Sequence, residues 1–304
     1  MNHSVPPSPF DLTAYLDNKR RVIDQALEEI IKSHFADTRL CRAMQYSLMA
    51  SGKRLRPVLC MAAAETVGEV NPQVIAVACG IEMIHTYSLI HDDLPAMDND
   101  DLRRGKPTCH VQFDESTAIL AGDALLTFAF EIFASASVPP ENAGLMLQVI
   151  RNISKAAGHK GMIEGQMQDI AAEGRALDLD ALKTLHNLKT GALIEASVVS
   201  GALLATGPKS EEIPQLEIYA RHIGLAFQVV DDILNVEGDA AEMGKATGTD
   251  ASRGKSTYPA LLGLSQSKAF AAELVNNALQ ALKIFGNKAG SLAALANYII
   301  ERKR

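Results

Sequence analysis

Residues 89–105, LIHDDLPAMDNDDLRRG, end a long apolar run with two adjacent carboxylates, Asp92 and Asp93. Carboxylates placed side by side repel by about 4 kcal/mol at roughly 4 Å and an effective dielectric near 20. A helix C-terminus adds to this repulsion, because its partial negative charge disfavours acids. The same string also holds Asp98 and a tandem pair of arginines, so one short segment carries metal-type and phosphate-type ligands. Acids placed in this way indicate bound cations.

A second aspartate pair, Asp231 and Asp232, ends another apolar run within residues 223–239, IGLAFQVVDDILNVEGD. The apolar residues recur every three or four positions, as in a helix, and no run of strict alternation typical of strands stands out. One helical face consists of Leu216, Tyr219, Ala220, Ile223, Phe227, Val230 and Leu234. We therefore expect an all-α fold in which both aspartate pairs belong to long buried helices.

Short breaks at residues 68–72, 137–142 and 207–214 separate the apolar runs, and each has the length of a helix-to-helix connection. Because no linker divides the chain, we expect residues 1–304 to form a single domain, with residues 1–10 flexible. Residues 237–259 differ, since they hold four glycines directly after the second aspartate pair. This segment predicts a lid loop, and a surface excursion without function is the alternative.

Composition argues against several classes of partner. The 29 Lys and Arg residues against 36 Asp and Glu residues, net charge −7, disfavour nucleic acid and anionic membrane surfaces. The N-terminus has no basic leader, and polar residues such as Glu82 and Glu195 interrupt the apolar runs, so we expect neither a signal peptide nor a membrane span. The four cysteines lack zinc-type spacing. A cytoplasmic protein with reduced thiols is the expectation.

Each of the two long helices carries a polar stripe. The first stripe consists of His85, Ser88 and Asp92, and the second of Gln228, Asp231, Asp232 and Asn235. A polar stripe on a buried helix is costly unless it is satisfied. We therefore expect the stripes to face each other across a water-filled pocket. Pro95 cannot continue the first helix, so the chain should turn Asp98 back toward Asp92.

Carboxylate oxygens with few nitrogen or sulfur ligands nearby suit Mg²⁺, which keeps several waters and bridges to phosphate. Arginine forks bind phosphate oxygens in bidentate fashion. The basic candidates are Lys53, Arg54 and Arg56 of the GKRLRP turn, the tandem Arg103 and Arg104, and Lys189, Lys245 and Lys255. Any one of these alone is more often a solvated surface charge, but the combination with two acid pairs predicts a diphosphate site.

Together with HNLKTGALI at residues 186–194 and GKSTYPALLGL at residues 254–264, these strings resemble the trans-isoprenyl diphosphate synthases. The likeness is greatest to the bacterial farnesyl diphosphate synthases, and it extends in the same order over residues 35–304. The resemblance implies the isoprenoid synthase fold, a helical bundle around a deep central cavity. It also implies a homodimer without a stable membrane anchor.

The resemblance further implies a role for each matching residue. Metal ligands would be Asp92, Asp93, Asp98, Asp231 and Asp232. Isopentenyl diphosphate would be bound by Lys53, Arg56, His85 and Arg104, and the allylic diphosphate by Arg103, Lys189, Lys245 and Lys255. Catalytic groups near the reacting carbons would be Lys189, Thr190 and Gln228. The second motif departs from many relatives because Asn235 stands in place of a third Asp, which we expect to weaken metal affinity modestly.

The implied reaction is Mg²⁺-dependent prenyl transfer by ionisation, condensation and elimination, with three ions per site. Isopentenyl diphosphate attacks the allylic carbocation, and a proton passes to the released pyrophosphate. Tyr87 and Ser88 lie about 6–8 Å deeper than Asp92 at 1.5 Å per residue. Within the family an aromatic residue there marks the C15 farnesyl product. The alternatives are a C20 geranylgeranyl product and, for Tyr87 alone, an ordinary core aromatic.

Three rival functions are weaker. A phosphohydrolase is suggested by the His91-Asp92 dipeptide but would need further histidine ligands in suitable places. A terpene cyclase usually lines its pocket with aromatic side chains, whereas this chain has no Trp and 5% aromatics. A regulatory subunit of a heteromeric prenyl synthase would normally have lost one aspartate motif, and both are present here.

Overall fold

The computed structural model describes residues 10–136, 139, 142–207, 211–237 and 255–302, and these ranges are helical almost throughout. The first helices are α1 (Leu12–His34), α2 (Arg39–Leu48), α3 (Leu55–Val67), α4 (Pro72–Asp92), α5 (Cys109–Gln112), α6 (Glu115–Ser135) and α7 (Ala143–Ala157). Then follow α8 (Met162–Ala171), α9 (Leu179–His186), the π-helical turn η2 (Asn187–Gly191), α10 (Ala192–Thr206) and α11 (Ile213–Glu237). The chain ends with α14 (Tyr258–Leu262), α15 (Leu264–Ala281), the 3₁₀ segment η3 (Leu282–Ala289) and α16 (Gly290–Glu301).

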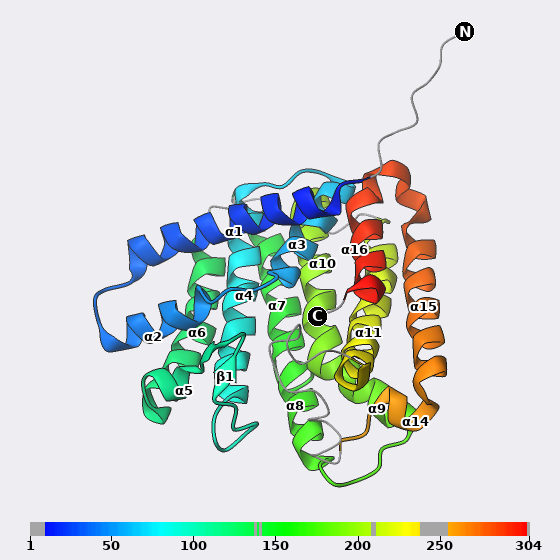
Figure 1. The fold of residues 1–304 in the computed structure, drawn as a ribbon. Coiled ribbons are helices and arrows are strands. Elements are labelled where there is room, and N and C mark those ends of the chain that lie inside the picture. The colour runs from blue at the N-terminus through cyan, green and yellow to red at the C-terminus, as the bar shows by residue number, and fades with distance from the viewer. Residues whose placement is uncertain (1–9, 137–138, 140–141, 208–210, 238–254, 303–304) are drawn as a thin grey trace.

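The predicted all-α architecture is confirmed. Within the described ranges the only strands are β1 (Leu102–Arg103) and β2 (Lys106–Pro107), which pair as a two-residue antiparallel hairpin. Figure 1 shows α1 running crosswise over one end of α3 and α4, while α9, α14 and the hairpin lie at the opposite end of the bundle. The polar stripes of α4 and α11 reach that opposite end, so the fold places both aspartate pairs there.

Helix α4 begins and ends at signals that are visible in the sequence. Asn71 caps its start by accepting a 2.9 Å hydrogen bond from the Val74 amide, and Pro72 occupies the first turn. The Asn71 side chain also donates to the Leu204 carbonyl at 2.9 Å, which fastens α4 to α10. At the other end, the chain turns back and the Asp98 amide donates to the Asp92 carbonyl at 2.8 Å. The predicted return of residue 98 toward residue 92 is therefore confirmed.

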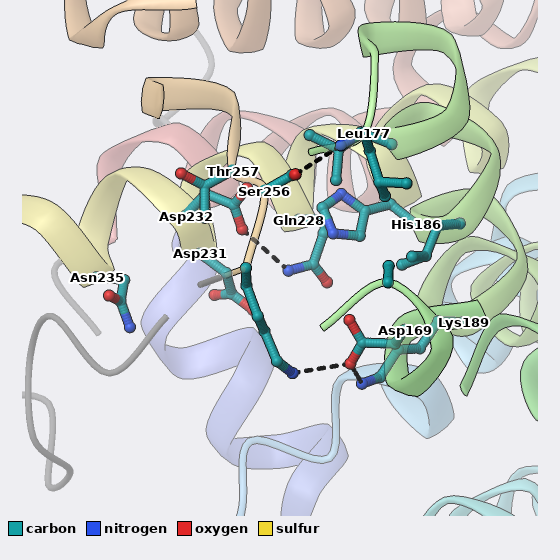
Figure 2. Close-up of a pocket in the computed structure, with 14 residues that line it drawn as sticks. Asp169, Leu177, His186, Lys189, Gln228, Asp231, Asp232, Asn235, Ser256 and Thr257 are labelled. Atoms are coloured by element: carbon teal, nitrogen blue, oxygen red, sulfur yellow. Dashed lines mark hydrogen bonds and ion pairs between the residues drawn. The ribbon is translucent and has the colours of Figure 1, made fainter. Parts of the chain in front are cut away.

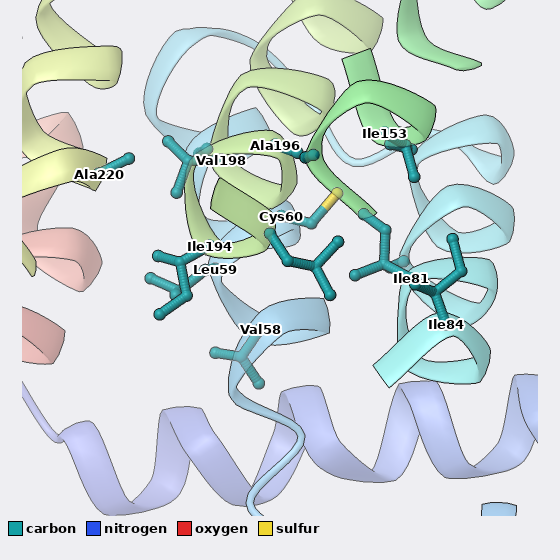
Figure 3. Packing of buried hydrophobic residues seen from close by; sticks show 14 of the residues in the cluster. Val58, Leu59, Cys60, Ile81, Ile84, Ile153, Ile194, Ala196, Val198 and Ala220 are labelled. Carbon is teal, nitrogen blue, oxygen red and sulfur yellow. The ribbon is translucent and has the colours of Figure 1, made fainter. Parts of the chain in front are cut away.

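The core is built around α3 and α10, which approach closely because of a glycine. A Cβ on Gly201 would lie 1.9 Å from the Cys60 carbonyl oxygen, so a larger residue would force the two backbones apart. Cys60 packs among aliphatic side chains of neighbouring helices such as Ile81 and Ile194 (Figure 3). Burial raises the pKa of the Cys60 thiol to about 12. The cysteines are free thiols, and Cys60 is an unreactive core residue.

Three helical stretches are long and apolar enough to cross a membrane by length and composition, contrary to our expectation from the sequence. They are Pro72–Asp92, Glu115–Ser135 and Leu179–Thr206. In the most apolar 18-residue window of each stretch, 67%, 50% and 72% of the residues, in the same order, are buried inside the protein. Because at least half of each window lies inside the protein, the apolar character of these helices serves the core of the bundle.

Candidate active site

Arg56 and Arg104, two basic candidates for the isopentenyl diphosphate site, lie close to His85 of the first polar stripe. Burial, followed by the positive charges of Arg56 and Arg104, lowers the pKa of His85 well below its usual value. His85 is therefore a neutral imidazole among arginines. Arg104 also donates to the Ser51 carbonyl at 2.7 Å, and a Cβ on Gly52 would lie 2.3 Å from its guanidinium. The GKRLRP turn and the tandem arginines thus come together, although they are about fifty residues apart.

Arg54 of the same turn is paired with two acids. Its side chain is 3% exposed and donates to Asp24 at 2.9 Å and to Glu82 at 2.8 Å. Burial alone would lower the pKa of Arg54, but Glu82 and Asp24 outweigh it and raise the pKa. Two acids therefore neutralise Arg54, although it lines a cavity together with Arg103 and Arg104, and its grouping with the phosphate ligands stays a prediction. Because its φ of 49° lies in the left-handed region, the turn sends residue 54 inward.

In the first aspartate cluster Asp93 is ion-paired, whereas the charged form of Asp92 is disfavoured. Arg103 holds Asp93 through its Nε, at 2.7 and 2.9 Å from the two carboxylate oxygens. Burial raises the pKa of Asp92 to about 6; Lys189 opposes this rise, and the carboxylates of Asp98 and Asp93 add to it. A group whose charge is disfavoured in this way is one that a bound cation would stabilise.

The second aspartate pair is held by two contacts that the sequence did not reveal. Arg302 donates to Asp231 at 2.5 Å and to the Phe227 carbonyl at 2.9 Å, and its guanidinium lies 4.0 Å from the Phe227 ring centroid. Asp232 accepts a 3.0 Å hydrogen bond from the Tyr258 amide. The pair therefore ties α11 both to the C-terminal residues and to the start of α14.

The second stripe lines a cavity of about 150 Å³, as the helical spacing predicted. Figure 2 shows Gln228, Asp231 and Asp232 of α11 on one side of it and Asp169, His186 and Lys189 on the other. The Thr190 hydroxyl donates to Gln228 Oε1 at 3.1 Å, across the cavity wall. The remaining lining residues are Ala172, Leu177, Leu182, Leu185, Asn235, Lys255, Ser256 and Thr257.

Two of the predicted allylic ligands share one partner, which sequence reasoning missed. Lys189 and Lys255 donate to the same oxygen of Asp169, at 2.7 and 2.8 Å. Lys189 lies in the π-helical turn η2, a feature often found at functional sites. A signal in the sequence was the spacing of Gly165 and Asp169, because four residues place both on one face of a helix.

The two aspartate clusters come within electrostatic reach of each other. The positive charge of Lys189, beside the second cluster, lowers the pKa of Asp92 and so limits its rise. The negative charge of Asp231 likewise raises the pKa of Arg56, which burial lowers. Among the residues that the structure describes, no three His, Cys, Asp or Glu side chains converge on one metal position. The expectation that the two acidic stripes face each other across water stays a prediction.

These donors nevertheless fit Mg²⁺. They are carboxylates, and burial raises the pKa of Asp92 and of Asp93. Mg²⁺ needs only one or two carboxylates when waters and phosphate oxygens complete its octahedron. Basic side chains for the phosphate lie within the same two clusters. The arrangement can therefore bind a diphosphate through both metal and arginine or lysine contacts.

The remaining sequence predictions fall on the chain-length positions and the lid. The Tyr87 side chain is buried, with its ring edge-on to His91 at 5.8 Å, and the Ser88 hydroxyl donates to the His85 carbonyl at 2.8 Å. Of the expected lid at residues 237–259, Glu237 ends α11 and residues 258–259 begin α14. Residues 238–254, and with them Lys245, lie outside the described residues, as do residues 1–9 of the expected flexible start.

Comparison with known proteins gives a consistent picture. The sequence profile of the family described as "Polyprenyl synthetase" matches residues 37–293. The chain is 49% identical to farnesyl diphosphate synthase of Escherichia coli (strain K12), over 97% of this chain and 100% of that protein. It is 47% identical to the chloroplastic heterodimeric geranylgeranyl pyrophosphate synthase large subunit 1 of Arabidopsis thaliana, over 98% and 81% of the two chains. A geranyltransferase structure from Legionella pneumophila superposes with a TM-score of 0.85 at 33% identity, covering 96% and 97%.

Proposed function

Since this chain belongs to the polyprenyl synthetase family and is a prenyltransferase, we propose that it condenses isopentenyl diphosphate with dimethylallyl or geranyl diphosphate to give farnesyl diphosphate. The observation that carries the proposal is the convergence of Lys189, Lys255 and the second aspartate pair on one cavity. A site with paired acids and paired bases suits a substrate that is itself a metal-bound diphosphate.

Asp92, Asp93 and Asp98 on one side and Asp231 and Asp232 on the other would hold Mg²⁺, three ions per site, which when bound neutralises the charge of the departing pyrophosphate. Asp93 and Asp231 are paired with arginines in this structure. Filling the site would therefore exchange partners, with Asp93 and Asp231 turning to the cation and Arg103 to phosphate. Asn235, buried next to this cluster, contributes an uncharged oxygen at most.

The basic side chains divide between two diphosphates. Arg103, Lys189 and Lys255, with Lys245, would bind the allylic diphosphate. Lys53, Arg56, His85 and Arg104 would bind isopentenyl diphosphate. Because His85 is held neutral among arginines, it would donate a hydrogen bond to a phosphate oxygen without adding charge.

Thr190 and Gln228 would act on the reacting carbons through their oxygen dipoles. Both side chains line or adjoin the cavity, and their hydrogen bond fixes the orientation of the amide. An oxygen dipole that is already oriented stabilises a developing carbocation without reorganisation. The proton lost after condensation would pass to an oxygen of the released pyrophosphate, since no protein base is required.

The product length is assigned to Tyr87. Its buried ring lies about one and a half turns before Asp92 on α4, where an aromatic side chain would limit the product to C15. The C20 product is the alternative because relatives of both kinds match. A homodimer in the cytoplasm completes the proposal.

The test is to incubate the purified chain with Mg²⁺, isopentenyl diphosphate and each allylic starter, and to size the products. Elongation to C15 that stops in excess chelator is expected. Phosphate release without elongation would instead favour the phosphohydrolase, and hydrocarbon release the cyclase. A chain that is inactive alone but stimulates a partner synthase would favour the regulatory subunit.

A further inference from the structure

We propose that Asp169 is a positioning residue for the allylic diphosphate: its carboxylate draws Lys189 and Lys255 into one paired cationic site. The inference rests on the proposed function and deepens it, because it names what holds the two lysines in place. Asp169 itself does not touch the reacting atoms in this scheme.

The geometry joins three parts of the chain at one atom. Oδ2 of Asp169 on α8 accepts from Lys189 Nζ at 2.7 Å and from Lys255 Nζ at 2.8 Å. Lys189 belongs to η2 and Lys255 to the segment that precedes α14, so the partners are 20 and 86 residues away in sequence. The exposed fraction of the side chain is 14% for Asp169, 25% for Lys189 and 17% for Lys255, so all three groups are largely shielded from bulk water.

The backbone is shaped to allow this contact. Gly165 lies one turn before Asp169 on α8, on the same helical face. A Cβ at Gly165 would lie 2.2 Å from the Lys189 amide nitrogen, so only glycine lets α8 approach η2 this closely. The close approach is what brings the Asp169 carboxylate within reach of the Lys189 ammonium group.

The charges explain why a carboxylate is useful between two substrate ligands. Two ammonium groups that converge on a diphosphate repel each other before it arrives, and the attraction of each to a shared carboxylate offsets this repulsion. One carboxylate between two ammonium groups still leaves an excess positive charge for the anion. An ammonium group has three N–H donors, and the bond to Asp169 uses one of them, so phosphate oxygens and Asp169 can be bound together. The low pKa of Asp169, which the two lysines maintain against burial, keeps the carboxylate charged.

The experiment compares Asp169→Asn and Asp169→Glu with the control Asp180→Asn, which removes an exposed acid paired with Lys183. KM is measured separately for geranyl diphosphate and for isopentenyl diphosphate. We expect Asp169→Asn to raise KM for geranyl diphosphate about tenfold, the effect of one lost charge-assisted contact, and the inhibition constant of inorganic pyrophosphate to rise in parallel. KM for isopentenyl diphosphate and all values of the control should change less than about twofold.

Two further variants separate positioning from a general loss of structure. Asp169→Glu keeps the charge and should recover part of the lost affinity, which also serves if Asp169→Asn folds poorly. In a Lys189→Met, Lys255→Met background, adding Asp169→Asn should have no further effect on KM, because Asp169 acts through the lysines.

An unchanged or lower KM for geranyl diphosphate in Asp169→Asn would overturn the inference, as would equal increases for both substrates. A full additional effect in the lysine-free background would do the same. If the wild-type protein itself formed no elongated product, the proposed function would fail first, and this outcome is distinct from all of these.

Discussion

Replacing Tyr87 by alanine should lengthen the product, and the structure allows the effect to be worked out. Tyr87 precedes Asp92 by five residues, which places it about 7.5 Å farther along the axis of α4 at 1.5 Å per residue. Its side chain is only 6% exposed, so its ring fills interior space. Truncation opens room that is comparable to one further five-carbon unit. We therefore expect the main product to shift from C15 to C20.

The same substitution should also have a predictable cost in stability. Removing a buried aromatic ring costs about 3–5 kcal/mol of unfolding free energy, including the loss of the edge-on contact with His91. Tyr87→Phe is the matched control. Among the described residues the buried Tyr87 hydroxyl has no hydrogen-bond partner, so its removal should leave stability equal or higher by about 1 kcal/mol. Tyr87→Phe should keep the C15 product because it keeps the ring.

The assay uses radiolabelled isopentenyl diphosphate with geranyl diphosphate, followed by sizing of the dephosphorylated products, and urea unfolding of each variant. A folded Tyr87→Ala protein that still stops at C15 would remove Tyr87 from this role. A Tyr87→Phe protein that made C20 would show that the hydroxyl group, and not the bulk of the ring, limits the product.

Three other outcomes can be measured. Glu82→Gln should lower the unfolding free energy by about 3–5 kcal/mol in urea titration, because it leaves the buried Arg54 charge partly uncompensated; a loss below about 1 kcal/mol would contradict this. Arg302→Gln should lower the Mg²⁺ concentration for half-maximal activity about threefold, since Asp231 loses a competing cation, and a higher requirement would refute the competition. Burial is the main reason that the pKa of His186 is lowered to about 3, so this side chain is neutral in the folded protein. In the unfolded chain the same imidazole takes up a proton below about pH 6.5. Stability should therefore fall by about 3 kcal/mol from pH 7 to pH 4, and His186→Phe should show a flatter pH dependence.

Some of the site could be predicted from local sequence because the relevant physics is local. The four-residue spacing from Gln228 to Asp232 defines a helical face, and that face lines the cavity. Pro95 ended α4 as expected, because a ring without an amide hydrogen cannot continue a helix. The apolar periodicity of α11 likewise led to a buried helix.

The partners of the charged side chains could not be predicted in this way. Arg54 and Arg56 look equivalent in the GKRLRP turn, yet Arg54 is paired with Asp24 and Glu82, whereas the buried Nε of Arg56 has no hydrogen-bond partner among the described residues. Asp169 showed no acidic motif of its own. Its two lysines reach it only because α8, η2 and the segment before α14 pack together.

The sequence by itself determined the all-α class and the two buried helices that carry the aspartate pairs, since helical periodicity and charge density are properties of short segments. The first pair ends α4 as expected, but the second lies inside α11, which continues to Glu237. Only the tertiary structure decided which base neutralises which acid. Arg302 meets Asp231 across 71 residues, and Lys255 meets Asp169 across 86. Such contacts depend on how helices cross and on where a glycine lets two backbones approach, and neither is written in the spacing of a single motif.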